Sequence, residues 1–182
     1  MPVIRYPFID IAVHENVRTH YAEGEAVVLF SADMTEVLWA NGRGAGLFGY
    51  ESVYDFLDQG PPLRDLPFRQ VAAAGRQLRT PGAVSRLTIR VPSGFQRLAI
   101  SASCRLVEAC GQPAVLFSAP IEQEPMSTAG RARSMIEGLY DPDTHIAIVD
   151  GEGEVIAGST GFSDLGLAAP TGRMLATMAG SE

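Results

Sequence analysis

The sequence has few of the residues that build cross-linked or metal-bound structures, since two of its 182 residues are cysteine and three are histidine. Cys104 and Cys110 cannot form the disulfide framework of a small secreted domain, and neither has a partner at metal-ligand spacing. We therefore predict that Cys104 is a small buried hydrophobe and that Cys110 lies in a turn. Three histidines leave little room for acid–base catalysis, and no catalytic triad or carboxylate pair follows from the spacing. This stretch of chain is therefore not expected to be an enzyme.

Long hydrophobic runs are also missing, and no run approaches the roughly 20 apolar residues that span a bilayer. The N-terminus, "MPVIRYPFID", lacks the basic-then-apolar pattern of a signal peptide. We expect a cytoplasmic location with no membrane segment in this chain. Apolar residues make up 46% and charged residues 19%, which is typical of a globular protein.

An excess of positive charge is absent too, because the formal net charge is −7. Nucleic-acid binding requires clustered Lys and Arg, so the composition argues against a nucleic-acid partner. Four arginines fall on predicted strands, where we expect solvated positions on the outer face: Arg86, Arg90, Arg97 and Arg105.

An amphipathic helix is predicted over residues 8–22, with its end at Gly24. Its apolar stripe has helical spacing and consists of Ile9, Val13, Val17 and Tyr21. The sequence allows two packing partners for this stripe and does not decide between them. It packs on the outer face of a sheet, where Ala99, Ser101 and Ser103 leave room, or it meets the same helix in a second subunit.

Strand patterns dominate the rest of the first 120 residues. The predicted strands are 26–31, 36–40, 85–91, 95–107 and 114–120, and the segments 51–60 and 68–79 are predicted helices. Apolar and polar residues alternate along the last three strands, as they do in an antiparallel sheet with one buried face. On residues 95–107 the inward positions are Leu98, Ile100, Ala102, Cys104 and Leu106. The fold class is therefore α+β.

The composition changes after residue 120, where "PIEQEPMSTAGR" reads as a linker followed by a short helix near 132–140. Beyond it, the strand-turn-strand pattern of the first unit recurs at an offset of 118 residues: Glu36-Val37 matches Glu154-Val155, and Leu47 matches Leu165. We expect a helix over 1–25, a domain over 26–120, a linker over 121–132 and an incomplete second unit over 133–182.

The segment "EVLWANGRGAGLFGY", residues 36–50, admits two interpretations. Gly44, Gly46 and Gly49 match the G-x-G-x-x-G motif of dinucleotide-binding folds. That motif requires a following parallel strand, whereas the next segment contains Pro61 and Pro62. In the alternative, the side chain of Asn41 caps a short helix, Leu47 and Phe48 enter the core, and Gly49 ends the helix.

The same segment resembles the second strand, the helix-opening Asn and the Leu-Phe-Gly-Tyr ending of PAS sensory domains. The order of helices and strands over residues 26–119 is similar to the PAS core. This resemblance implies a five-stranded antiparallel sheet that curls around a pocket closed by short helices. Several glycines follow Asn41 where the family usually has alanines, which weakens this helix by roughly 1 kcal/mol per Gly relative to Ala.

A helix before the first PAS unit, and a second unit after a linker, resemble the sensory half of a bacterial sensor histidine kinase. The run "HENVRTHYAEGEAVVLFSADMTEVLWANGRGAGLFGY" is similar to the PdhS-type cell-cycle kinases related to PleC and DivJ. The resemblance implies a homodimer, with a kinase core and a response regulator as partners in a longer parent chain.

The resemblance also bears on ligands. Residues 68–79 contain no His to hold haem and residues 41–80 no Cys to bond flavin, so both groups are disfavoured and no cofactor is identified. The candidate pocket residues are Trp39, Phe48, Phe56, Leu87, Ile89 and Ile100. They either line a ligand pocket or simply fill a packed core, and the sequence leaves both alternatives open.

Overall fold

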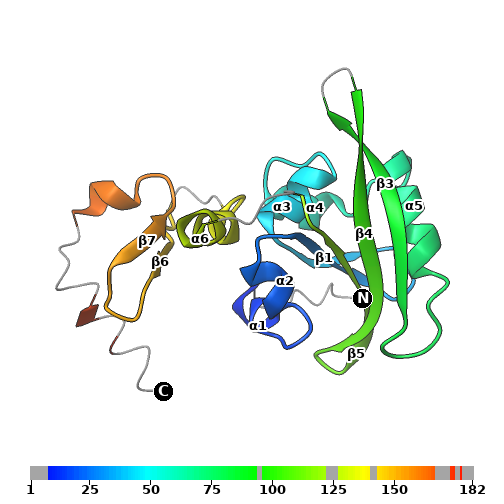
Figure 1. Ribbon diagram of the computed structural model, residues 1–182, viewed down its shortest axis with the longest axis horizontal. Coiled ribbons are helices and arrows are strands. Elements are labelled where there is room, and N and C mark those ends of the chain that lie inside the picture. The colour runs from blue at the N-terminus through cyan, green and yellow to red at the C-terminus, as the bar shows by residue number, and fades with distance from the viewer. Residues whose placement is uncertain are drawn as a thin grey trace.

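A five-stranded antiparallel sheet organises the first two thirds of the chain (Figure 1). The computed structural model describes residues 8–93, 96–121, 127–139, 143–166, 173–174 and 177. The strand order is β2-β1-β5-β4-β3, so all neighbouring strands run in opposite directions. The strands are β1 Ala26–Ser31, β2 Val37–Ala40, β3 Val84–Ser93, β4 Gln96–Ala109 and β5 Gln112–Ala119. This architecture confirms the predicted α+β PAS fold.

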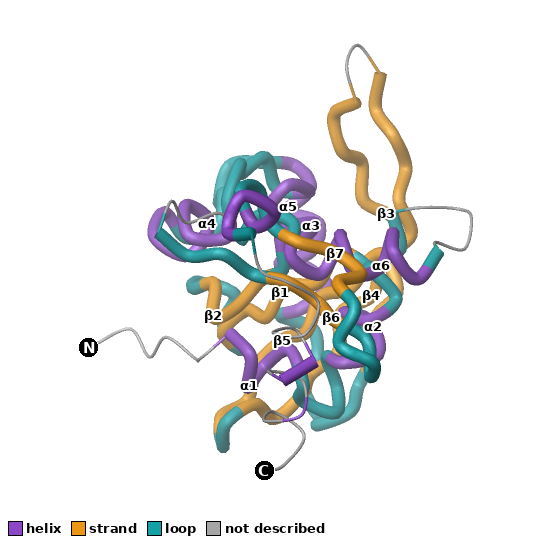
Figure 2. Tube along the Cα trace, turned by 90° about the vertical axis from the view of Figure 1, so that its left-hand side faces the viewer, coloured by secondary structure: helices purple, strands orange, loops and turns teal. Residues whose placement is uncertain are grey.

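The β3–β4 hairpin is longer than the sequence pattern predicted, and its end projects beyond the rest of the domain (Figure 2). Ile100, Ala102 and Cys104 face the core as expected. The prediction for Leu98 was wrong, because this side chain lies near the projecting end and is 47% exposed. Alternation therefore predicts which side chains of a strand are buried only where helices cover that part of the strand.

Three helices cover the core face of the sheet: α3 Gly42–Leu47, α4 Val53–Gln59 and α5 Leu66–Gly75. Aromatic rings fill the space between these helices and the strands. Phe48 lies 5.6 Å from Phe56 and 5.6 Å from Phe117 between ring centroids, and Phe30 lies 5.5 Å from Phe68. Rings at these separations pack favourably, and their burial is a major source of stability for a domain of this size.

The N-terminal segment forms two short helices, α1 Phe8–Ala12 and α2 Arg18–Ala22, so the prediction of one continuous helix was wrong. A turn separates them, in which the ring Nδ1 of His14 accepts a hydrogen bond from the backbone N–H of Asn16 at 3.4 Å. Such local side-chain bonds compete with helical backbone bonds. The break splits the predicted stripe: Val17 and Tyr21 are buried, whereas Ile9 and Val13 are 68% and 63% exposed.

Both short helices pack on the outer face of the sheet, opposite α3–α5 (Figure 1). Their apolar partners come from β1, β2 and β5 together with the end of β4, and include Val27, Leu29 and Leu116. The helices do not cover Ala99 and Ser101, which stay exposed, so the expected packing site was wrong. The β3–β4 half of the outer face is therefore open.

A further helix, α6 Thr128–Ile136, leads from the first sheet to a two-stranded hairpin, β6 Ala147–Val149 and β7 Val155–Gly158, with the short 3-10 helix η1 Phe162–Leu165 (Figure 1). The helix begins earlier than predicted, inside the segment expected to be a linker. Among the described residues, none of the helices has the length and apolar content to cross a bilayer.

The second hairpin repeats the hydrogen bonds of the first. The N–H of Asn41 donates to the carbonyl of Val27, and the N–H of Val27 donates to the side chain of Asn41. Likewise, Ser159 N–H donates to the carbonyl of Ile146, and Ile146 N–H donates to the hydroxyl of Ser159. Ser159 lies 118 residues after Asn41, at the offset read from the sequence.

Candidate functional site

The strand-to-helix corner at Asn41 joins three elements through one buried side chain. Its Oδ1 accepts hydrogen bonds from the N–H of Val27 at 2.9 Å and of Gly44 at 2.8 Å. Its Nδ2 donates to the carbonyl of Glu25 at 2.7 Å, and the residue is 1% exposed. Asn41 therefore caps α3 and also fixes the start of β1. Gly49, with φ +87, follows the end of α3.

The dinucleotide-binding interpretation of the glycines does not agree with this geometry. β1 and β2 are antiparallel, whereas that fold needs parallel strands beside the glycine loop. The N–H of Gly44 donates to Asn41 and so serves as a helix-cap donor. Gly44 allows α3 to pack closely against β1, because a Cβ at this position would lie 2.4 Å from the carbonyl oxygen of Val27.

The corner also contacts the segment that leads to the β6–β7 hairpin. We call residues 127–139, comprising α6 and the turn after it, the connector. A Cβ on Gly42 would lie 1.7 Å from the carbonyl oxygen of Glu137, and a Cβ on Gly138 would lie 2.7 Å from the Cα of Gly42. The two backbones are therefore in direct contact, which only glycine permits at both positions.

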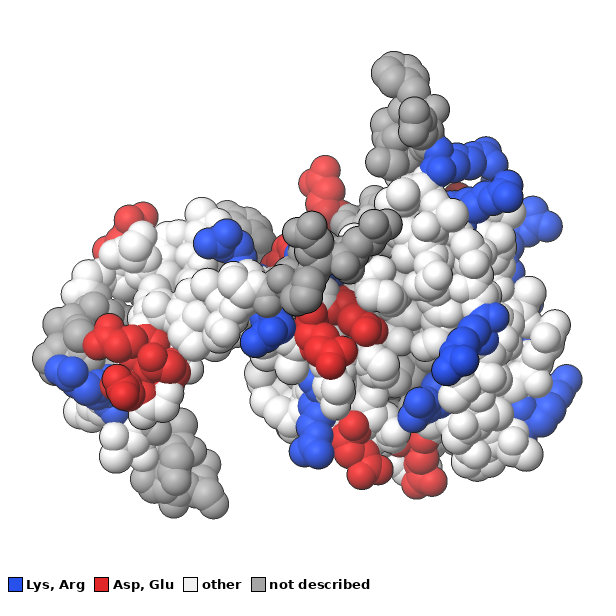
Figure 3. All heavy atoms as spheres, in the orientation of Figure 1, with Lys and Arg blue, Asp and Glu red and all other residues white. Residues whose placement is uncertain are grey.

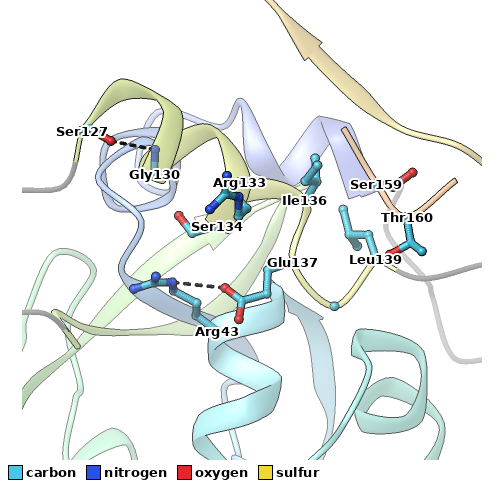
Figure 4. Close-up of a pocket in the computed structure, with 11 residues that line it drawn as sticks. Arg43, Ser127, Gly130, Arg133, Ser134, Ile136, Glu137, Leu139, Ser159 and Thr160 are labelled. Atoms are coloured by element: carbon cyan, nitrogen blue, oxygen red, sulfur yellow. Dashed lines mark hydrogen bonds and ion pairs between the residues drawn. The ribbon is translucent and has the colours of Figure 1, made fainter. Parts of the chain in front are cut away.

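Polar contacts hold the connector at three further points. The N–H of Val53 on α4 donates to the carbonyl of Gly138 at 3.2 Å. The hydroxyl of Tyr21 on α2 donates to the carbonyl of Met135, and burial raises the pKa of Tyr21 to about 12, so this phenol stays protonated. Arg43 and Glu137 form an ion pair at 3.4 Å (Figure 4). The connector thus contacts α2, α3 and α4 together.

A cleft lies on each side of the connector. The first has a volume of about 670 Å³ and a mixed polar and apolar lining, and Figure 4 shows Arg43 of α3 and Arg133 of α6 on one side with Ser159 and Thr160 on the other. The second is an apolar groove of about 780 Å³ between the N-terminal helices and β6, lined among others by Ile9, Val13 and Ile148. Ile136 and Leu139 line both clefts.

The predicted pocket residues do not form one group. Phe48, Phe56, Ile89 and Ile100 share the core beneath α3–α5, and Leu87 packs against that core. Trp39 lies on the opposite face of the sheet, where its Nε1 donates to the carbonyl of Phe8 at 3.1 Å and its ring packs 5.8 Å from Tyr21. Its assignment to the pocket was therefore wrong.

A β-bulge explains this misplacement. Leu29 pairs with Trp39, but the next residue, Phe30, pairs with Val37, so Leu38 is an extra residue in β2. A bulge reverses the face on which the following side chains lie. Simple alternation placed Val37 and Trp39 together, whereas Val37 enters the core and Trp39 the outer cluster.

The two cysteines lie where the sequence predicted. Cys104 is buried, and desolvation raises the pKa of its thiol to about 12, so it is an unreactive packing residue. Cys110 has φ +49 in the β4–β5 turn. Within the described ranges, no cluster of His, Cys, Asp and Glu could hold a metal ion.

No family model matches the chain. The chain is 36% identical over 166 residues to the cell-division control histidine kinase PdhS of Brucella ovis, and equally to those of Brucella canis and Brucella abortus. The match covers 91% of this chain but 15% of each kinase, so the chain spans a small part of its relatives.

Two solved PAS domains are also similar. The PAS domain of an HTR-like protein from Haloarcula marismortui matches with a TM-score of 0.43 and 12% identity, covering 58% of this chain and 95% of that domain. The PAS domain of nitrogen regulation protein NR(II) from Vibrio parahaemolyticus matches with a TM-score of 0.40 and 10% identity, covering 63% of this chain and 98% of that domain.

Proposed function

We propose that this chain, which contains a PAS domain and is homologous to one segment of the PdhS histidine kinases, regulates a kinase in a longer parent protein. In this proposal the PAS domain receives a signal from a ligand or a partner and passes it along the connector, while the N-terminal helices set the geometry of a dimer. The parent is a cytoplasmic two-component kinase that phosphorylates a response regulator.

The contact between the connector and the corner carries this proposal. Any change in the position of α2, α3 or α4 displaces at least one partner of the connector, because Tyr21, Gly42 and Val53 each contact it. Coupling between sites requires such a physically continuous element. The connector precedes the second hairpin in the chain, and α6 contacts β7, so a displacement of the connector moves that hairpin as well.

We also propose that residues 133–182 belong to a second PAS unit. The equivalent bonds at Asn41 and Ser159, and the matching positions of β2 and β7, support this assignment. In the first unit β1 pairs with both β2 and β5, whereas β6 pairs with β7 alone among the described residues. In this proposal residues 1–25 carry the N-terminal helices and residues 26–120 form the first PAS unit, while the segment 121–132, expected as a linker, includes the start of α6.

A pure protein-interaction module, without a small ligand, is the second candidate function. The close ring contacts of Phe30, Phe48, Phe56 and Phe68 favour it, because they fill the space where an interior ligand would lie. In that case the signal is the binding of a partner, and the connector transmits it in the same way.

Replacing Tyr21 by Phe tests transmission through the connector. The variant keeps the ring packed against Trp39 but removes the hydrogen bond to the Met135 carbonyl, at a cost of about 1 kcal/mol. In the full-length chain that contains this segment, we expect the autophosphorylation rate to shift toward that of a variant lacking the PAS domain. The Tyr54→Phe variant, which changes an exposed tyrosine, should retain the wild-type rate.

Two results would argue against the proposed function. One is a full-length chain that shows no autophosphorylation at all. The other is a Tyr21→Phe chain with the wild-type rate, in a protein whose rate does change when the PAS domain is deleted.

The dimer prediction is tested at Ile9 and Val13. These exposed side chains lie on and just after α1, and they are well suited to contact a second copy of the chain. We expect the Ile9→Asp, Val13→Asp double variant to halve the mass measured by light scattering while the fold remains intact. Val17 cannot serve in this test, because it is buried and an aspartate there would unfold the N-terminal segment. An unchanged mass would exclude α1 from the dimer interface.

A further inference from the structure

Positive charge is concentrated in one part of the chain. All fourteen basic residues are arginine, and eight of them lie between residues 61 and 107, together with one of the twenty-one acidic residues, Asp65. This segment therefore carries a net charge of +7, while the rest of the chain carries −14. All eight side chains are exposed: Arg64, Arg69, Arg76, Arg79, Arg86, Arg90, Arg97 and Arg105.

The fold places these arginines around one edge of the sheet. β3 is the edge strand, β4 is its neighbour, and α5 packs against β3. In Figure 3, Lys and Arg side chains gather on the right-hand side, over β3, β4 and α5, whereas acidic side chains gather toward the centre and the left. The charge separation in the sequence is thus also a separation in space.

Four of the arginines share the open half of the outer sheet face. The register pairs Arg86 with Ser103, Arg90 with Ala99, and Pro92 with Arg97, and pairs Val84 with Arg105. Positions two residues apart on a strand lie on the same face, so Arg86, Arg90, Arg97 and Arg105 form one stripe about 26 Å long. We call it the arginine face. The side chains between them are small: Thr88, Ala99 and Ser101.

A recess lies beside one end of the arginine face. It has a volume of about 440 Å³ and lies where the β3–β4 hairpin meets α3 and the start of α5, since Leu47, Phe48 and Leu66 are among its lining residues. Arg64, Arg90 and Arg97 also line it, with Asp65 as its single acidic residue. Arginine has the planar geometry to form paired hydrogen bonds with a carboxylate, so three arginines in the lining of one recess suit an acidic side chain.

We propose that the arginine face is a docking surface for an acidic segment of a partner protein, with one carboxylate side chain seated in the recess. The stripe is as long as about eight residues of an extended chain, which suits a peptide segment rather than a small anion. Opposite charge on the partner would raise the association rate and select this face. Charge, strand register and the recess support this assignment, which holds whether or not the parent is a kinase.

Two other occupants agree less well with the charge distribution. A nucleic acid would be repelled by the −14 charge of the remaining chain, and the stripe offers Thr, Ala and Ser, not aromatic rings, between its arginines. A second copy would bring an acidic surface against the arginine face. Such a contact joins two different surfaces, so contacts of this kind build rings or open chains of molecules.

A fluorescent poly-glutamate peptide of about 20 residues is a suitable probe, titrated against the purified chain with anisotropy as the readout. We expect binding that weakens from about 50 to about 300 mM NaCl. The Arg86→Glu, Arg90→Glu variant should lose at least about tenfold in affinity. The matched control Arg18→Glu, Arg133→Glu has the same net charge, changes two exposed arginines elsewhere, and should lose less than about threefold. If circular dichroism shows that the charge reversal disturbs the fold, the Arg86→Gln, Arg90→Gln variant is measured in its place.

The amide resonances that shift on titration should belong mainly to β3 and β4. Equal losses in the two double variants, or shifts spread over the whole chain, would overturn the proposal. So would tighter binding of duplex DNA than of the peptide. The protein could also form larger oligomers as its concentration rises. If Arg86→Glu, Arg90→Glu abolished these oligomers, the arginine face would be assigned to a second copy of the chain instead.

Discussion

Replacing Gly42 by alanine is expected to displace the connector and to lower the free energy of unfolding by about 2 kcal/mol. The added methyl group would lie 1.7 Å from the carbonyl oxygen of Glu137 and 2.2 Å from its carbonyl carbon. These are backbone atoms, so no flexible side chain can move aside. Chemical denaturation, followed by circular dichroism, measures the change.

Gly46 provides the matched control, since it lies in the same helix and has no atom within 4 Å of an added Cβ. Alanine favours a helix over glycine by up to about 1 kcal/mol, so Gly46→Ala is expected to leave the stability unchanged or to raise it. If Gly42→Ala were as stable as Gly46→Ala, the close contact between α3 and the connector would not exist in solution.

The second large effect is expected for Asn41→Ala, with a loss of about 2–4 kcal/mol. The variant removes the acceptor for the N–H groups of Val27 and Gly44 and the donor to the carbonyl of Glu25. Val27 is completely buried, so water cannot replace the lost partner of its N–H. Thermal and chemical denaturation of the purified variant measure the loss.

Ser52→Ala separates helix capping from the wider role of Asn41. Ser52 caps α4 by accepting a bond from the N–H of Asp55 at 3.1 Å, at an exposed position. Losing such a cap typically costs about 1 kcal/mol. The difference between the two variants therefore reports the bonds that Asn41 makes to β1. Equal losses would mean that Asn41 acts as a helix cap alone.

Local patterns in the sequence were sufficient for much of the fold. The antiparallel sheet follows from alternation, and the role of Asn41 from the preference of its side chain for helix starts. The predictions failed where a single residue interrupts the alternation of a strand or the periodicity of a helix. Leu38 forms a bulge and moves Trp39 to the other face, and His14 lies at the break between α1 and α2.

The contacts of the connector could not have been predicted from any short segment. Tyr21 and Met135 are 114 residues apart, and the sequence contains no signal that pairs them. The glycines hinted at close packing, but Gly42, Gly44 and Gly46 look alike in sequence and differ entirely in what surrounds them. Similarly, the concentration of arginine over residues 61–107 is visible in sequence, yet only the strand register places four of these residues on one open face.

Hydrogen–deuterium exchange across the connector tests the central claim most directly, namely that the first PAS unit holds the connector in place. In the wild-type chain, we predict slow exchange at the amide of Val53, which donates to Gly138, and at the amides of α6. In Gly42→Ala these amides should exchange at least about tenfold faster, while those of β4 and β5 remain protected. Unchanged exchange in α6, or exchange in the wild type as fast as in an unfolded peptide, would contradict the account.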